Sequence, residues 1–127
     1  SLSIWSYLVK KVLVVEDDLV QQKHICTVLA SCGVQVVAAS NGVEGLEKAK
    51  SENPDLIFMD IVMPEMDGYS ACRQITTDED TKHIPVVIVS SKNEEADKVW
   101  AQLQGATAMV AKPFTDDDLK AQISALT

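Results

Sequence analysis

Short apolar runs alternate with amphipathic segments along most of the chain. The runs are rich in valine and isoleucine, which favour strands. Between them, apolar residues recur three and four positions apart, which is typical of helices with one buried face. Strands are expected over residues 11–15, 34–39, 55–59, 85–90 and 107–111. Helices are expected over 18–31, 41–50 and 67–76, and from 93 and 115 onward.

The runs at 11–15, 55–59 and 85–90 are almost entirely apolar instead of alternating with polar residues. Strands of this kind are buried on both faces, as in a parallel sheet with helices on each side. We therefore predict a doubly wound α/β fold, a three-layer sandwich of five strand–helix units. The 127 residues suit one domain, expected over 10–127, with 1–9 as an N-terminal tail or the remnant of a tag.

Local signals predict where helices begin and end and which side chains are buried. Gly33 is expected to stop the first helix, and Thr115 is expected to cap the last one, with acids in its first turn. Ala96 and Leu103 fall on the same helical face as Trp100, so we interpret Trp100 as a core anchor. The cysteines are interpreted as small buried hydrophobic residues: Cys26, Cys32 and Cys72.

Charge and cysteine content narrow the function classes. There are 19 acidic residues against 11 lysines and arginines, a net charge of −8, which argues against binding of a nucleic-acid backbone. No apolar run is long enough to span a bilayer, so we expect no membrane partner. Three cysteines without paired spacing favour free thiols in a reducing cytoplasm over a zinc site.

Chemically active residues follow four of the five expected strands. Glu16 and Asp17 follow the first strand, Asp60 the third, Ser90 closes the fourth, and Lys112 follows the fifth. Only uncharged residues follow the second. Ligands of open α/β sheets bind beyond the carboxyl ends of the strands, where the strand order reverses. A strand order of 2-1-3-4-5 would place these four ends side by side.

This set of residues is suited to phosphoryl transfer. Clustered carboxylates repel one another, and a hard divalent cation such as Mg²⁺ relieves that repulsion through oxygen ligands. Lys112 and Ser90 can bind phosphoryl oxygens. A carboxylate can itself attack phosphorus, so Asp60 is a candidate nucleophile that would form an acyl phosphate.

Four motifs carry a resemblance to a known family. They are VVEDD (14–18), MDIVMPEMDG (59–68), IPVVIVSS (84–91) and KPF (112–114). With their spacing, the chain resembles the receiver domain of two-component response regulators, which has a flavodoxin-like fold. The segment 94–106 is similar to receivers of type IV pilus chemotaxis-like systems.

The resemblance implies a role for each site residue. Asp60 corresponds to the phosphoacceptor and, with Asp17, to a direct Mg²⁺ ligand. The backbone carbonyl of Val62 corresponds to a third ligand, and Glu16 to an acid that acts through water. Ser90 corresponds to the switch hydroxyl.

Lys112 corresponds to the lysine that contacts the phosphoryl group, and the bond before Pro113 is expected to be cis. The family also implies a signalling phosphoacceptor in the cytoplasm, not a conventional enzyme. A histidine kinase would supply the phosphoryl group, and the protein would promote its own phosphorylation and dephosphorylation with Mg²⁺. A protein partner would read the state through the face formed by the fourth helix, fifth strand and fifth helix. No residues remain for an effector domain, unless the chain was cut from a longer protein.

Two positions depart from the family pattern. Met109 stands where many receivers have a Tyr or Phe that moves with the hydroxyl, which puts that route of output in question. Val62 is apolar where some rapidly hydrolysing receivers carry a polar residue, so we hypothesise a longer-lived phosphoryl group. Val62 also argues against a haloacid-dehalogenase-like phosphatase, which needs an acid there. The other alternative is an interaction module that never takes phosphate.

Overall fold

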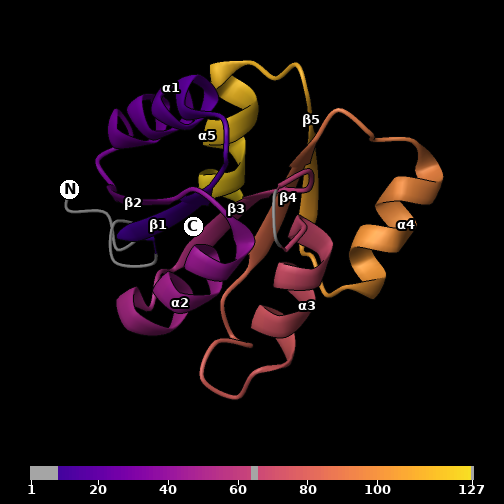
Figure 1. The fold of residues 1–127 in the computed structure, drawn as a ribbon. Coiled ribbons are helices and arrows are strands. Elements are labelled where there is room, and N and C mark those ends of the chain that lie inside the picture. The colour runs from indigo at the N-terminus through magenta and orange to yellow at the C-terminus, as the bar shows by residue number, and fades with distance from the viewer. Residues whose placement is uncertain (1–8, 64–65, 127) are drawn as a thin grey trace.

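A computed structural model describes residues 9–63 and 66–126 as a parallel five-stranded sheet flanked by helices (Figure 1). The strand order is β2-β1-β3-β4-β5, which confirms the predicted order and the α/β fold class. The strands are β1 (Lys11–Val15), β2 (Gln35–Ala39), β3 (Leu56–Asp60), β4 (Val86–Ser90) and β5 (Ala108–Ala111). Asp60 is thus the last residue of its strand.

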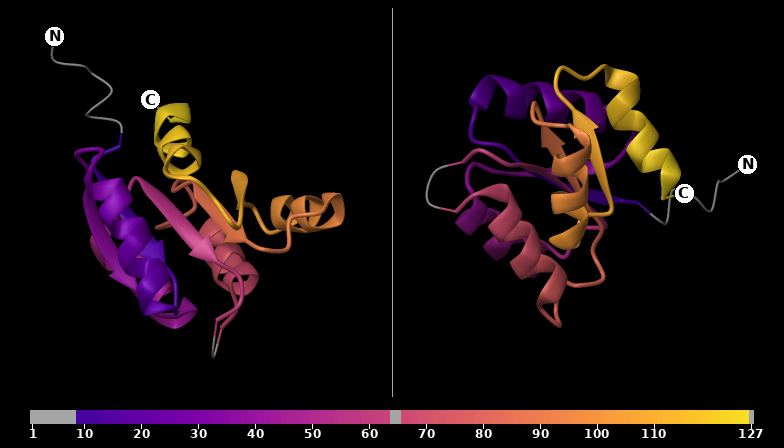
Figure 2. Two further views of the ribbon diagram at one scale, coloured as in Figure 1. Left: turned by 90° about the horizontal axis from the view of Figure 1, so that it is seen from above. Right: turned by 90° about the vertical axis from the view of Figure 1, so that its right-hand side faces the viewer.

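Helices cover both faces of the sheet and make the predicted three layers (Figures 1 and 2). One hydrophobic core joins the sheet to α1 and α5, and the other joins it to α2, α3 and α4. The helices are α1 (Leu19–Ala30), α2 (Gly42–Glu52), α3 (Gly68–Thr77), α4 (Glu95–Leu103) and α5 (Asp116–Ala125).

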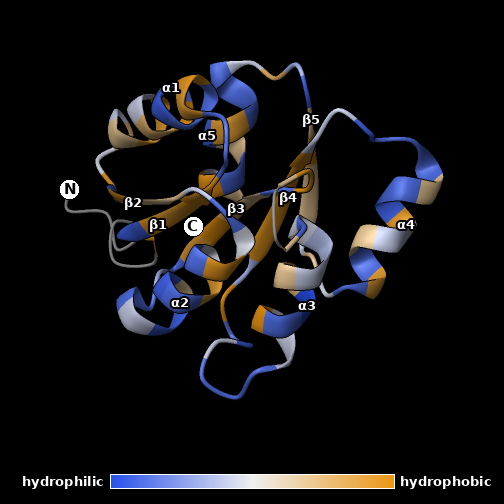
Figure 3. Ribbon diagram, in the orientation of Figure 1, coloured by the Kyte–Doolittle hydropathy of each residue, from blue (hydrophilic) through white to orange (hydrophobic). Residues whose placement is uncertain are grey.

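Successive side chains of the central strands pack alternately into the two cores. In β1, Leu13 and Val15 pack toward α2 and α3, whereas Val12 and Val14 pack toward α1 and α5. Every residue of β3 and of β4 is buried. These strands are therefore apolar because both of their faces are buried, as the sequence predicts. Figure 3 shows hydrophobic colour along them.

Helix ends follow the expected signals. The Gly33 backbone has a φ of 82°, a left-handed conformation that ends the turn after α1. The hydroxyl of Thr115 accepts a hydrogen bond from the N–H of Asp118, whose carboxylate accepts one from the N–H of Thr115. This capping box fixes the start of α5. Asp18 caps α1 by accepting hydrogen bonds from two backbone N–H groups at 3.0 Å.

The expectation that Trp100 anchors the core is wrong. Trp100 is 52% exposed, Leu103 is 60% exposed, and Ala96 is also exposed. Ala101 is the buried residue of α4, so this helix meets the sheet through a small side chain on its other face. Helical spacing shows that apolar residues share a face, but not whether that face meets the sheet or the solvent.

The prediction that all three cysteines are buried holds only for Cys72. Cys26 is half-buried, and Cys32 is exposed because it lies in the turn beyond the last residue of α1. Val9, the last residue of the predicted N-terminal tail, is buried in the core on the α1 and α5 side. The rest of that predicted tail, residues 1–8, lies outside the described residues.

No helix in the described parts of the chain combines the length and apolar character needed to cross a bilayer.

The cysteine environments predict graded thiol reactivity. Burial raises the pKa of Cys72 to about 12 and also raises the pKa of Cys26, so little thiolate forms at either site near neutral pH. In the native protein an aromatic disulfide reagent should modify Cys32 first, Cys26 more slowly, and Cys72 only after unfolding. Peptide mapping after timed quenching measures this order, and early modification of Cys72 would contradict it.

Candidate functional site

The register of the parallel strands brings the predicted site residues to one edge of the sheet. Val15 of β1 pairs with Met59 of β3, so Glu16 and Asp60 are the next residues along adjacent strands. Ser90 of β4 pairs with Ala111 of β5, which places Lys112 one position further. Strands β1, β3, β4 and β5 are neighbours in the sheet, so their carboxyl ends form one continuous site.

Three carboxylates converge at this edge. Glu16, Asp17 and Asp60 each place an oxygen within 4.8 Å of the others. Glu16 is 2% exposed and Asp60 is 9% exposed, whereas Asp17 lies in the solvent-exposed part of the site. Two buried acids beside a third repel one another unless a cation compensates them.

Lys112 supplies a cation to two of these acids. Its Nζ donates a hydrogen bond to Oε1 of Glu16 at 2.9 Å and another to Oδ1 of Asp60 at 3.1 Å. The contact with Asp60 is in keeping with the predicted role of Lys112. The ion pair with Glu16 was not predicted, because the sequence gives no indication of which acid a lysine on a distant strand will meet.

Burial and charge shift the pKa values of this pair. Burial raises the pKa of Glu16; the hydrogen bonds from Lys112 and the Asp18 N–H oppose the rise in part, and the charge of Asp60 adds to it. Burial lowers the pKa of Lys112, but the hydrogen bond to Glu16 and the charges of Asp60 and Glu16 outweigh this effect and leave the pKa raised. Lys112 is therefore a firmly protonated cation in the site.

Ser90 is buried and held by the loop that follows it. Its Oγ accepts a hydrogen bond from the N–H of Lys92 at 2.9 Å, and its hydroxyl can still donate to another group. The Ser90 carbonyl accepts a hydrogen bond from the N–H of Lys112 at 2.9 Å. The predicted switch hydroxyl and the predicted phosphoryl-binding lysine are thus connected through the backbone.

Gln22 is a site-supporting residue that sequence reasoning missed. Its Nε2 lies within hydrogen-bonding distance of the carbonyls of Glu16 and Ala39, at 2.8 and 3.1 Å, and of Ser40 Oγ at 3.3 Å. This amide joins the β1–α1 loop, which carries the acids, to the end of β2. A glutamine inside an amphipathic helix looks like an ordinary surface residue, so its sequence context gives no signal.

The loop after Asp60 is positioned by a close backbone approach. The N–H of Gly68 donates to the carbonyl of Ile61 at 2.8 Å. A Cβ on Gly68 would overlap the backbone carbonyl of Asp60, so this position requires glycine. Val62, in the same loop, is 75% exposed.

The donor set fits a hard divalent cation. Three carboxylates with oxygens close together are the ligand type that Mg²⁺ prefers, and their mutual repulsion favours such an ion. The Lys112–Pro113 peptide bond is cis, as the resemblance predicts.

Comparison with known proteins identifies the family. The sequence pattern described as the response regulator receiver domain matches residues 12–124. The chain is 40% identical over 116 residues to protein PilH of Pseudomonas aeruginosa, with 91% of this chain and 96% of PilH covered. It also matches several transcriptional regulators, and spans about half of their length.

Solved structures agree with these sequence matches. The chemotaxis protein CheY4 of Vibrio cholerae superposes with a TM-score of 0.87 at 26% identity, and covers 94% of this chain and 99% of its own. The receiver domain of sensor histidine kinase PA1611 from Pseudomonas aeruginosa superposes with a TM-score of 0.85 at 29% identity, over 92% and 96% of the two chains. That structure has a magnesium ion coordinated in its active-site cleft. The chain therefore belongs to the receiver domain family of two-component response regulators.

Proposed function

We propose that Asp60 accepts a phosphoryl group from the phosphohistidine of a histidine kinase. The observation that supports this most directly is the meeting of three carboxylates and one lysine at the end of β3. Asp60 lies at the centre of that group, within reach of Asp17 and hydrogen-bonded to Lys112. As in receivers generally, the site would work in the cytoplasm.

The transfer exchanges one bond to phosphorus for another. An Oδ of Asp60 attacks the phosphorus, a P–O bond forms, and the P–N bond to the donor imidazole breaks while that ring takes up a proton. Lys112 is placed to neutralise the charge of the incoming phosphoryl oxygens. Asp17, Asp60 and the Val62 carbonyl, with Glu16 through water, would hold Mg²⁺, which supplies further positive charge when bound.

The phosphoryl group would be read through the loop after β4. The Ser90 hydroxyl donates to a phosphoryl oxygen in the modified form, and the loop whose Lys92 N–H donates to Ser90 Oγ shifts with it. A group that interacts better with one of two loop arrangements shifts their populations. We propose that the face of α4, β5 and α5 then changes its affinity for a protein partner.

Met109 would replace the missing aromatic side chain in this switch. It is half-buried and packs against the core on the α2, α3 and α4 side. Its flexible thioether can fill the space that opens when the loop moves.

Phosphorylation can be tested by intact mass. Incubation with Mg²⁺ and acetyl phosphate should add one phosphoryl group to the wild-type chain, and none to Asp60→Asn or to a sample without metal. Asp60→Asn should keep the fold, because the amide occupies the same space. An adduct of equal yield in the variant would contradict the assignment of Asp60.

Lys112→Ala tests whether phosphorylation of Asp60 can be separated from the structural response to it. The variant should still take a phosphoryl group, because Asp60 and the acids remain, but residues 90–94 should no longer respond to it. Amide chemical shifts with and without Mg²⁺ and beryllofluoride measure the response, and Lys120→Ala on α5 is the matched control. Undiminished shifts in Lys112→Ala would contradict its role.

Val62 should lengthen the phosphoryl lifetime because an apolar side chain cannot position an attacking water. Val62→Asn should therefore shorten the half-life of the adduct several-fold, measured as loss of the added mass after donor removal. Val20→Asn is the control and should leave the half-life unchanged. Val20 is also an exposed valine, but it lies on α1. A wild-type half-life as short as that of the chemotaxis receiver would contradict this interpretation.

A further inference from the structure

Two aromatic side chains join α3 to α4 on the outside of the molecule. The rings of Tyr69 and Trp100 meet edge to face, with centroids 6.4 Å apart and planes at 81°. Trp100 continues into exposed apolar residues on α4, since Val99 is 50% exposed and Leu103 is 60% exposed. We call Tyr69, Val99, Trp100 and Leu103 the α3–α4 patch.

Fixed carboxylates flank this patch at its end nearest the site. Asp67 caps α3 by accepting a hydrogen bond from the N–H of Ser70 at 2.8 Å. Asp97 accepts one from the N–H of Glu94 at 3.0 Å in the capping box of α4. Burial raises the pKa of the Tyr69 hydroxyl, and the charges of Asp97 and Asp67 raise it further. Both acids therefore direct negative charge toward the aromatic pair.

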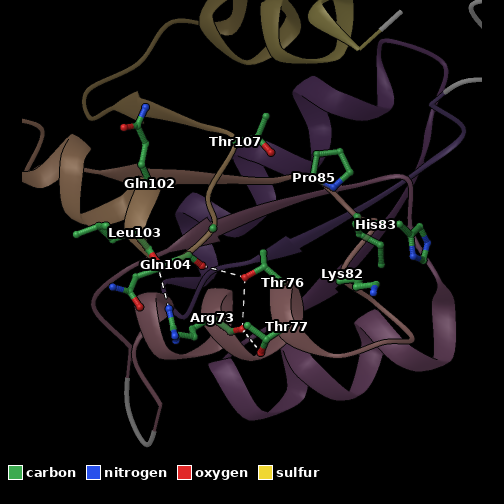
Figure 4. Close-up of a pocket in the computed structure, with 12 residues that line it drawn as sticks. Arg73, Thr76, Thr77, Lys82, His83, Pro85, Gln102, Leu103, Gln104 and Thr107 are labelled. Atoms are coloured by element: carbon green, nitrogen blue, oxygen red, sulfur yellow. Dashed lines mark hydrogen bonds between the residues drawn. The ribbon is translucent and has the colours of Figure 1, made fainter.

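The other end of the patch is anchored. Arg73 of α3 donates to the carbonyl of Leu103 at 3.2 Å (Figure 4). The Thr76 hydroxyl lies within hydrogen-bonding distance of the carbonyls of Gln104 and Cys72, at 2.9 Å from each. Arg73 and Thr76 line a polar cleft of about 410 Å³, whose rim also carries Lys82. Side chains of α3 thus hold the carboxyl end of α4, so the patch is ordered before any partner arrives, which lowers the cost of binding.

The patch carries acids at one end and a cation at the other, and these charges indicate its occupant. Asp97 and Asp67 act on Tyr69 of the aromatic pair, whereas Arg73 donates to the Leu103 carbonyl. A second copy is disfavoured as the occupant because two chains of net charge −8 repel each other. A cation beside an apolar group is favoured instead, because it can pair with the two carboxylates and lie against the face of Trp100.

We propose that the α3–α4 patch docks a protein segment that presents Lys or Arg next to an apolar side chain. The apolar group covers Trp100 and Leu103, and the cation faces Asp67 and Asp97. This surface lies on the α3 side of α4, away from α5, and its chemistry does not depend on phosphorylation of Asp60.

The test uses a defined probe on the full chain. The probe is a capped helical peptide of alanine, leucine and lysine, with leucine and lysine repeating at helical spacing; its comparison peptide has glutamate in place of lysine. The lysine peptide should bind and shift the amide resonances of residues 67–73 and 95–104. The glutamate peptide should not bind. Shifts confined to other surfaces would overturn the proposal.

Matched variants test which residues of the α3–α4 patch contact the lysine peptide. Trp100→Ala should weaken the lysine peptide at least tenfold, and Leu103→Ser provides a second apolar test should Trp100→Ala fold poorly. Val43→Ala, at a partly exposed valine on α2, should have no effect. Asp67→Asn with Asp97→Asn should also weaken binding, since asparagine keeps both caps and removes only the charge.

Asp118→Asn is the charge control, because Asp118 has the same capping role on α5. An equal loss in Asp118→Asn would overturn the assignment to α3 and α4. A dimer in sedimentation that Trp100→Ala dissolves would also overturn it, in favour of a second copy. The peptide is tested on the unphosphorylated chain, so the two proposals are tested independently. If the peptide does not bind, the proposed role of Asp60 still stands. If Asp60 is not phosphorylated, the proposed docking surface still stands.

Discussion

A parallel sheet that is buried on both faces leaves the ends of its strands as the places for charge. In this molecule the constraint concentrates Glu16 and Asp60 at one edge, where both are almost inaccessible to solvent. Such acids are tolerated only with a compensating cation. Lys112 meets this need by reaching both carboxylates from the end of β5, and so links the first, third and fifth strands through one ammonium group.

The two loops that leave this site lead directly to the outer surface. The loop after Asp60 enters α3, where Tyr69 is the second residue, and the loop after Ser90 enters α4, which carries Trp100. The contact between these two rings therefore joins the two helices that follow the loops. A change at Asp60 or Ser90 that moves either helix would alter this contact. The α3–α4 patch is separate from the proposed output face that includes β5, where Met109 stands in place of an aromatic residue.

Much of the fold and site could be predicted from the sequence because the relevant signals are local. Fully apolar runs show which strands are central, and parallel strands bring the residues at their ends to one edge. Asp60, Ser90 and Lys112 therefore lie at the same edge of the sheet, as expected. Trp100 could not be placed, since the same helical spacing fits a face toward the sheet or toward solvent. The pairing of Lys112 with Glu16 and the bridging role of Gln22 depend on side-chain contacts between distant segments, which one sequence does not encode locally.

The central claim is that Asp60 is the residue that becomes an acyl phosphate. Borohydride reduces an acyl phosphate to an alcohol, so it converts a phosphorylated aspartate to homoserine. The most direct test is to treat the phosphorylated chain with borohydride and sequence its peptides by mass spectrometry. The account predicts homoserine at position 60 and unchanged residues at Glu16 and Asp17. Reduction at either of those acids with Asp60 unchanged would contradict it.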